Sequence, residues 1–381
     1  MKVKQIYTLL NDIVAEELGQ TALVQEDLSN IVEVGQTIAN AMSFDKFTGK
    51  LVDRIGRMVF VDRQYQARLL KIVRDGWEYG SIMCKVDGDL PVTEENEEWS
   101  LVDGSTYDPN QVYVADIYAK YFNMHVTFEI PVTIVSDQLK SAFASANEMN
   151  RFVSMIFGLV SKAFNKALDS LTTRAVINAM AVLANSNNSA RVVHLLTDYA
   201  SDTGDSTLTT AELALSSESF LRYASSRILE KKRDIAELSV LFNEGGRPRQ
   251  TTEEYLHLVL HAKFASRCDT YLKSQTFHDE LVKIPGYETV AKWQGFGTSD
   301  DWADTSKINV TAKLADGTTA SVVLDDICGF MFDRDAIAVL QPKEKITSQY
   351  NGKGDFTNYW YKYTGEYIND FNENMVLFVI D

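Results

Sequence analysis

The chain has 381 residues, of which 45% are hydrophobic and 24% are charged. These proportions are typical of a folded protein and exclude an intrinsically disordered one, and the length predicts two or three packed regions. The formal net charge of −16 argues against a sequence-independent nucleic-acid binder, because such binding depends on Lys and Arg neutralising phosphates.

The cysteine content and the N-terminal sequence predict an intracellular protein. Three cysteines, Cys84, Cys268 and Cys328, are far apart and odd in number, which favours reduced thiols over a disulfide framework. The most apolar run, residues 152–160, is too short to span a bilayer, and the N-terminal residues lack a signal-peptide pattern. We therefore expect a soluble product with no membrane partner.

The first 75 residues carry mainly helical patterns. Residues 3–18 and 28–42 place apolar side chains three and four positions apart, the period of one helix face. We expect a third helix that reaches Ile55, then an extended piece over residues 57–62 and a helical turn that ends near Val73. These small helices show no obvious core of their own and suggest an extended arm.

A long two-stranded excursion is predicted next. Residues 79–86 are strand-like, and residues 112–118 return as an extended chain after an acidic, poorly patterned tip. A two-stranded ribbon is marginally stable alone, so we expect this one to pack on another surface.

The stretch from residue 147 to residue 184 predicts one very long helix. It contains no proline and a single glycine, Gly158, and its apolar residues follow helical spacing. Ser145 and Glu148 form a capping-box pattern at its start. At ~1.5 Å per residue the helix would be roughly 55 Å long, and its wide apolar stripe favours a buried beam over half of a coiled coil. Residues 123–135 precede it as a β-rich segment in which Pro131 indicates an edge strand or a bulge.

The remainder of the chain mixes helix and strand patterns. We expect a partly mobile loop over residues 185–210, with helices over 217–229 and 264–274. The expected strands lie at 236–243, 256–260, 309–314, 320–324, 330–333 and 336–340, with a final pair around 372–374. Asp316-Gly317 is the strongest hairpin signal. Strands precede, interrupt and follow the long helix, which is an α+β pattern.

No motif in the sequence supports catalysis, a cofactor or a metal. His257 and His261 are four apart but alternate with leucines, which indicates a strand and not a helical metal pair. No Gly-x-Ser-x-Gly or Cys-x-x-Cys motif occurs, and residues 352–355 contain only fragments of a phosphate loop, which suggests a surface turn. The acidic segments at 87–98 and 300–304 are interpreted as solvated loops, with a weak ion site as the alternative at 87–98. We therefore expect a protein that is not an enzyme.

The order of these parts is distinctive: a helical arm, a β-ribbon, an apolar strand, a very long helix, a mixed region and a C-terminal aromatic strand tract. Together with the runs FEIPVTIVSDQL and ICGFMFDRDAIAVL, it resembles the major capsid protein of tailed bacteriophages, the Hong Kong 97-type fold shared with encapsulin shells. The resemblance implies an N-arm (1–75), an extended loop (76–122), a peripheral domain with a spine helix (123–185 and 342–381) and an axial domain (186–341).

The resemblance also implies a structural function. Copies would form homo-pentamers and homo-hexamers of an icosahedral virion capsid that encloses double-stranded DNA without sequence-specific binding, assembled in the bacterial cytoplasm. Portal, scaffolding and head-decoration proteins are further candidate partners. An encapsulin-like compartment shell is the alternative, and a carboxylate enzyme or a binding module is a remote one. The extended loop would contact a neighbouring subunit, and its tip supplies the contact candidates Glu94, Glu95, Glu97, Glu98 and Trp99.

Overall fold

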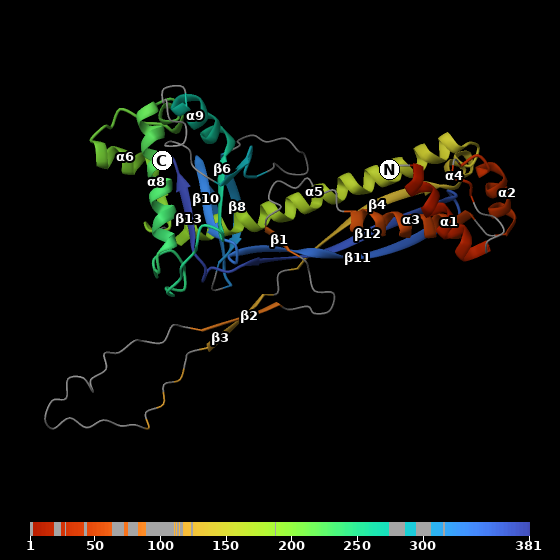
Figure 1. Ribbon diagram of the computed structural model, residues 1–381, viewed down its shortest axis with the longest axis horizontal. Coiled ribbons are helices and arrows are strands. Elements are labelled where there is room, and N and C mark those ends of the chain that lie inside the picture. Colours follow the sequence, from red (N-terminus) through yellow and green to blue (C-terminus); the bar gives the residue numbers. More distant parts are fainter. Residues whose placement is uncertain are drawn as a thin grey trace. The chain divides into compact units, whose positions relative to one another are not determined.

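A computed structural model describes most of the chain (Figure 1). The described residues are 3–18, 24–26, 28–41, 44–62, 72–74, 83–88, 110, 112, 114, 117–122, 125–186, 188–273, 286–294, 306–314 and 317–381. The chain forms two compact units. The first unit comprises Met1–Glu78, His125–Thr172 and Val339–Tyr367, and the second comprises Tyr79–Met124, Thr173–Ala338 and Ile368–Asp381. Runs of helices and runs of strands follow one another without regular βαβ alternation, which confirms the α+β class.

The first unit is built on a four-stranded sheet of order β1-β11-β12-β4. Its strands are β1 (Val73–Arg74), β4 (His125–Val135), β11 (Ile337–Asn351) and β12 (Phe356–Asn369). Pro131 lies on β4 opposite Trp360, and β4 is the edge strand that the proline predicted. The turn at residues 352–355 joins β11 to β12 and confirms the surface turn expected there.

The predicted long helix is α5 (Ala146–Ser186), which has 41 residues and is therefore roughly 60 Å long. At its start the amide of Glu148 donates to Ser145 Oγ at 3.2 Å, as the capping pattern predicted. The carboxylate of Glu148 accepts from Arg151. Short helix α4 (Ser136–Ala142) precedes it.

An aromatic core holds α5 against the sheet of the first unit. The ring centroids of Phe164 and Tyr363 lie 4.6 Å apart, and those of Phe128 and Tyr363 lie 5.4 Å apart. Phe164 is 1% exposed and Tyr363 is fully buried. Burying such rings contributes about 1.5–3 kcal/mol each. The apolar stripe read from the sequence is thus the buried face of the helix, and α5 acts as a beam.

The N-terminal helices differ from the prediction. They are α1 (Val3–Leu18), α2 (Ile31–Ala41) and α3 (Phe44–Asp62). Residues 57–62, expected to be extended, continue α3, because β-branched and aromatic residues disfavour a helix too weakly to end one already begun. Val73 lies in strand β1 and Ile72 before it has a 3₁₀ conformation, whereas the other residues of the helical turn expected there lie outside the described residues.

The arm helices share a core with the rest of the first unit, in agreement with the expectation that they have no core of their own. Ile13, Phe47 and Leu51 are fully buried in one cluster with residues of β4, α5 and β12. The hydroxyl of Tyr361 in β12 donates to the carbonyl of Val52 in α3 at 3.1 Å. Sequence periodicity shows that a face is apolar, but not what covers it, so this core could not be predicted.

The second unit contains a five-stranded sheet of order β5-β13-β10-β6-β7. Its strands are β5 (Val192–His194), β6 (Leu256–His261), β7 (Tyr287–Val290), β10 (Ile327–Asp333) and β13 (Met375–Val379). Every residue of β10 and β13 is buried. Helices α6 (Leu195–Thr203), α7 (Ala211–Ala214), α8 (Glu218–Ala236) and α9 (Ala262–Lys273) also belong to this unit.

Three predictions in this unit were wrong. Residues 236–243 form no strand beyond an isolated bridge at Ser239. Leu238, Val240 and Leu241 are exposed, so the apolar sequence of this segment does not correspond to a buried strand. Helix α6 was missed because residues 195–203 are too few to display helical periodicity. The two C-terminal strands exist, but β12 and β13 lie in different sheets and do not pair with each other.

A separate antiparallel hairpin also belongs to the second unit. Strands β8 (Ile308–Lys313) and β9 (Thr319–Leu324) pair in antiparallel register, as predicted. Gly317 has φ of +86°, a conformation that glycine adopts without a steric cost.

Candidate assembly surface

A second two-stranded ribbon joins β2 (Met83–Gly88) and β3 (Ile117–Phe122), which confirms the predicted excursion. Successive side chains of a strand point to opposite faces, and exposure alternates accordingly over residues 84–88 and 117–121. The exposed face, called the outer face below, consists of Cys84, Val86, Gly88, Ile117, Ala119 and Tyr121. Val86, Ile117 and Tyr121 are 66%, 72% and 68% exposed.

The opposite face of the ribbon is polar and half-buried. Lys85 and Lys120 stand directly opposite each other in the register, an arrangement that is destabilising for like charges. Asp370 lies between them and accepts from Lys85 at 2.8 Å and from Lys120 at 3.0 Å. Lys85 also donates to Glu373 at 2.5 Å. These contacts fix the ribbon to the segment between β12 and β13.

Two arginines complete this contact. Arg249 forms an ion pair with Asp87 and donates to the hydroxyl of Tyr118 at 2.7 Å. The guanidinium of Arg247 lies 3.4 Å from the centroid of the Tyr118 ring, a cation–π contact. We call Lys85, Asp87, Lys120, Arg249, Asp370 and Glu373 the anchor cluster. It holds three cations and three carboxylates, so its formal charges balance.

The ionisation of the anchor cluster follows from burial and pairing. Burial by itself would raise the pKa of Asp370, but the ammonium groups of Lys85 and Lys120 outweigh it, and the pKa lies below its ordinary value. For Glu373 burial dominates, and the pKa is raised in spite of Lys85 and Arg249. Burial would lower the pKa of Lys85, but bonds to Asp370 and Glu373 raise it. Asp370 and Lys85 are therefore charged at neutral pH.

The ribbon thus inverts the usual polarity of an antiparallel pair, in which apolar residues face the protein and polar residues face water. Its charged face is anchored to the subunit and its apolar face is exposed. The alternation of apolar and charged residues is visible in the sequence. The partners of the charged residues, Arg249, Asp370 and Glu373, lie far along the chain, and no local sequence pattern identifies them. The contact candidates at the ribbon tip, Glu94, Glu95, Glu97, Glu98 and Trp99, lie outside the described residues.

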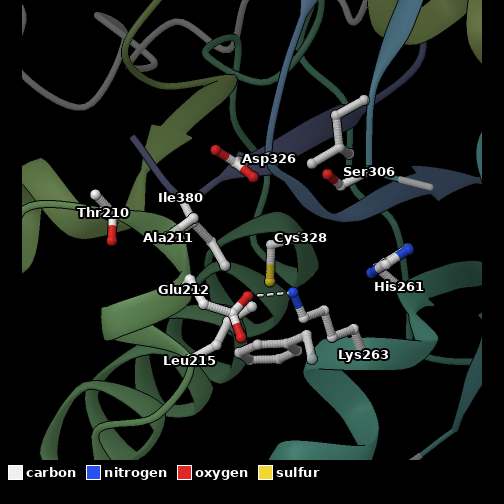
Figure 2. Close-up of a pocket in the computed structure, with 12 residues that line it drawn as sticks. Thr210, Ala211, Glu212, Leu215, His261, Lys263, Ser306, Asp326, Cys328 and Ile380 are labelled. Carbon is white, nitrogen blue, oxygen red and sulfur yellow. Dashed lines mark hydrogen bonds and ion pairs between the residues drawn. The ribbon is translucent and has the colours of Figure 1, made fainter. Parts of the chain in front are cut away.

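A pocket of about 240 Å³ lies in the second unit (Figure 2). Lys263 and Glu212 form an ion pair within it. Cys328 also lines it, and burial raises the pKa of this thiol well above its ordinary value, so the thiol stays protonated and is a poor nucleophile. The pocket therefore offers a neutralised ion pair and an inert thiol.

The histidine pair and the remaining described residues show no metal-binding arrangement. His257 and His261 lie on strand β6, as predicted, and their rings face different neighbours: Phe332 at 5.5 Å and Trp293 at 6.5 Å. Within the described ranges no group of three or more His, Cys, Asp or Glu side chains could hold a metal ion. No helix in the described part of the chain is long and apolar enough to cross a membrane.

Comparisons with known proteins identify the family. A family model described as "Phi29-like phage major capsid protein" matches residues 10–379. Among solved structures, a chain of "Structure of head fiber and inner core protein gp22 of native bacteriophage P68" has 12% identity and a TM-score of 0.52, covering 83% of this chain and 85% of that chain. A chain of the capsid of Staphylococcus phage Andhra has 10% identity and a TM-score of 0.48, with the same coverages.

A search of curated proteins found no match. The family match favours a viral capsid protein over the encapsulin-like alternative, and the predicted phage capsid fold is confirmed. The chain belongs to the Phi29-like phage major capsid protein family, whose function is structural.

Proposed function

We propose that copies of this protein assemble as pentamers and hexamers into an icosahedral shell that encloses double-stranded DNA. The shell forms in the cytoplasm of the bacterial host. Residues 76–122 are the extended loop of each subunit, and its outer face and tip lie over a neighbouring subunit. Portal, scaffolding and head-decoration proteins are the candidate accessory partners.

The observation that carries this proposal is the inverted polarity of the β2–β3 ribbon. Its outer face exposes Val86, Ile117 and Tyr121, and Val112 and Val114, which precede β3 in the sequence, are 80% and 82% exposed. Contiguous exposed apolar surface is rare on proteins that stay monomeric. Covering these five side chains with a neighbour would gain several kcal/mol at about 25 cal/mol per Å² of apolar area. A second copy is the partner that a capsid protein meets most often.

The net charge of the chain is consistent with a shell that encloses DNA. A chain with a formal net charge of −16 repels phosphates on average, so packaged DNA would not adhere tightly to the shell wall. Such a shell would enclose its genome without tight binding to the phosphate backbone.

Electron microscopy of Ile117→Asp and Ile117→Val proteins tests the proposal. Position 117 is exposed, so neither substitution should unfold the subunit. We expect shells from the wild-type chain and from Ile117→Val, which keeps an apolar surface, and none from Ile117→Asp. Normal shells from Ile117→Asp would remove the ribbon from the interface. A wild-type chain that forms no shell, ring or tube even at high concentration or with an added scaffold would overturn the assembly function itself.

A further inference from the structure

The exposed face of α5 carries an unusual stripe in the first unit. Between residues 151 and 166 the exposed positions follow one another at steps of four, four, three and four, so they line a single face of the helix. They are Arg151, Met155, Leu159, Lys162 and Lys166. We call these five residues the α5 stripe. It is roughly 22 Å long at ~1.5 Å per residue.

Two large apolar side chains form the middle of the α5 stripe. Met155 is 51% exposed and Leu159 is 56% exposed. They are four residues apart, so their side chains are neighbours on the helix surface. Helix α8 provides the comparison, since its exposed positions from 219 to 233 carry only serine, arginine and glutamate. An ordinary solvated face of this protein is therefore polar, and the α5 stripe is not.

The ends of the α5 stripe are positively charged. Residues 151–166 contain three cationic side chains and no carboxylate, although the whole chain has a net charge of −16. Arg151 forms an ion pair with Glu148 at 3.2 Å, just outside the stripe. Cations on both sides of an apolar pair complement a surface with apolar residues flanked by carboxylates.

Gly158 provides a separate observation within the same face. It lies in the interior of α5, where glycine is less favourable than alanine by about 0.5–1 kcal/mol. A Cβ atom added at this position would meet nothing within 4 Å, so packing inside the subunit does not require glycine. A missing side chain beside Met155 and Leu159 does allow another backbone to approach closely.

From the α5 stripe we infer a docking site for an acidic amphipathic helix of a partner protein. The partner would place apolar residues at i and i+4 on Met155 and Leu159, pass close over Gly158, and present carboxylates to Arg151, Lys162 and Lys166. This is recognition of a helix through i, i+4 anchors. Double-stranded DNA would satisfy the cations but would leave Met155 and Leu159 uncovered, so a helical peptide that carries both carboxylates and apolar anchors fits the α5 stripe better.

The test uses the full-length unassembled chain and a fluorescent synthetic helical peptide of 18 residues. The peptide has leucines at i and i+4 with glutamates flanking them on the same face, and the control peptide has the same composition in scrambled order. We expect the patterned peptide to bind at least tenfold more tightly than the scrambled one, as measured by fluorescence anisotropy.

Three variants locate the site. Met155→Ser/Leu159→Ser, Lys162→Glu/Lys166→Glu and Gly158→Leu should each weaken binding of the patterned peptide at least tenfold. Arg222→Glu/Arg233→Glu on α8 makes the same change in net charge and should leave binding unchanged. Circular dichroism verifies that each variant keeps the wild-type helix content.

Binding of DNA or of a second copy to the α5 stripe would give different results, and either result would overturn the inference. A 30-base-pair duplex that binds while the patterned peptide does not, and whose binding is lost only in Lys162→Glu/Lys166→Glu, would make the α5 stripe a DNA-facing surface. Self-association lost in Met155→Ser/Leu159→Ser, with no competition by the peptide, would make it a contact between copies. Equal binding of both peptides to all variants would leave the stripe without a specific partner.

Discussion

The second unit contains two antiparallel ribbons of equal strand length with opposite relations to solvent. Ribbon β8–β9 places Ile308, Ala312 and Val322 in the core. Ribbon β2–β3 exposes Val86, Ile117 and Tyr121 and turns its charged side chains toward the subunit. Each of the four strands has six residues, so length and pairing do not distinguish the ribbons. The position of the apolar face does.

The two ribbons differ in whether their apolar face is buried within their own chain. An isolated ribbon is marginal, so it must cover its apolar face to be stable. Ribbon β8–β9 covers that face inside its own subunit. Ribbon β2–β3 is held by the anchor cluster instead, and its apolar face remains available to another molecule.

A matched pair of alanine substitutions should give the largest contrast. Ala312 on β8 is fully buried and Ala119 on β3 is exposed. We expect Ala312→Asp to lower the free energy of unfolding by about 3–5 kcal/mol, because it leaves an unpaired charge in the core. Ala119→Asp should change it by less than about 0.5 kcal/mol and should block shell assembly. Urea unfolding and electron microscopy measure the two effects, and equal destabilisation by both substitutions would contradict the comparison.

Removing the central carboxylate of the anchor cluster should release the ribbon. Asp370→Asn leaves Lys85 and Lys120 facing each other without a shared counter-charge. We expect a loss of roughly 2–3 kcal/mol, less than for a fully buried pair because the lysines are 27% and 33% exposed. Hydrogen exchange of the β2–β3 amides should accelerate.

Asp325→Asn is the matched control for that substitution. Asp325 pairs with Lys307 at 2.7 Å, but both side chains are largely exposed, so the pair contributes at most about 1 kcal/mol. Unchanged exchange of β2–β3 in Asp370→Asn would show that the anchor cluster does not hold the ribbon.

Acid should release the same contact. Because the folded-state pKa of Asp370 is depressed, its contribution to stability is fully present above the ordinary value of 3.8 and is lost as the pH falls below that value. The raised pKa of Glu373 acts in the opposite sense, since its protonation on acidification favours the folded state. We expect the protection of β2–β3 amides, corrected for intrinsic exchange rates, to rise slightly as the pH falls from neutral to about 4, because Glu373 is protonated in that range, and to fall below pH 4 as Asp370 is protonated. An acid transition of the same size in Asp370→Asn would assign it to another group.

The smallest effect concerns the turn of the complete ribbon. Gly317 has φ of +86°, so Gly317→Ala should cost about 1 kcal/mol through backbone strain. Thermal unfolding of the unassembled chain measures it, with Gly49→Ala in α3 as the control. Gly49 has no neighbour within 4 Å of an added Cβ, so its replacement should stabilise the helix by about 0.5–1 kcal/mol. A stabilised Gly317→Ala protein would contradict the strain at this turn.

Sequence reasoning succeeded where one period persisted over many residues. The long helix, the Asp316-Gly317 hairpin and the strand that contains His257 and His261 all follow from local spacing. The strand predicted at residues 236–243 was wrong because the apolar residues Leu238, Val240 and Leu241 are exposed, and burial depends on what lies opposite them.

The sequence predicted the assembly surface only in part. The alternation of apolar and charged residues in β2 and β3 is present in the sequence, but the sequence does not show which of the two faces is turned toward the subunit. Lys85 meets Asp370 across 285 positions, a pairing that no short-range pattern specifies. Only the structure shows that the charged face of the ribbon contacts the subunit and that the apolar face is exposed.

The central claim is that the outer face of the β2–β3 ribbon is exposed in the free subunit and covered in the shell. Limited proteolysis of residues 83–122 in unassembled subunits and in purified shells tests this most directly, with the β8–β9 hairpin as the internal reference. We predict cleavage of the ribbon segment in free subunits and at least tenfold slower cleavage in shells, with no comparable change at the hairpin. Equal cleavage rates of the ribbon in both forms would contradict the claim.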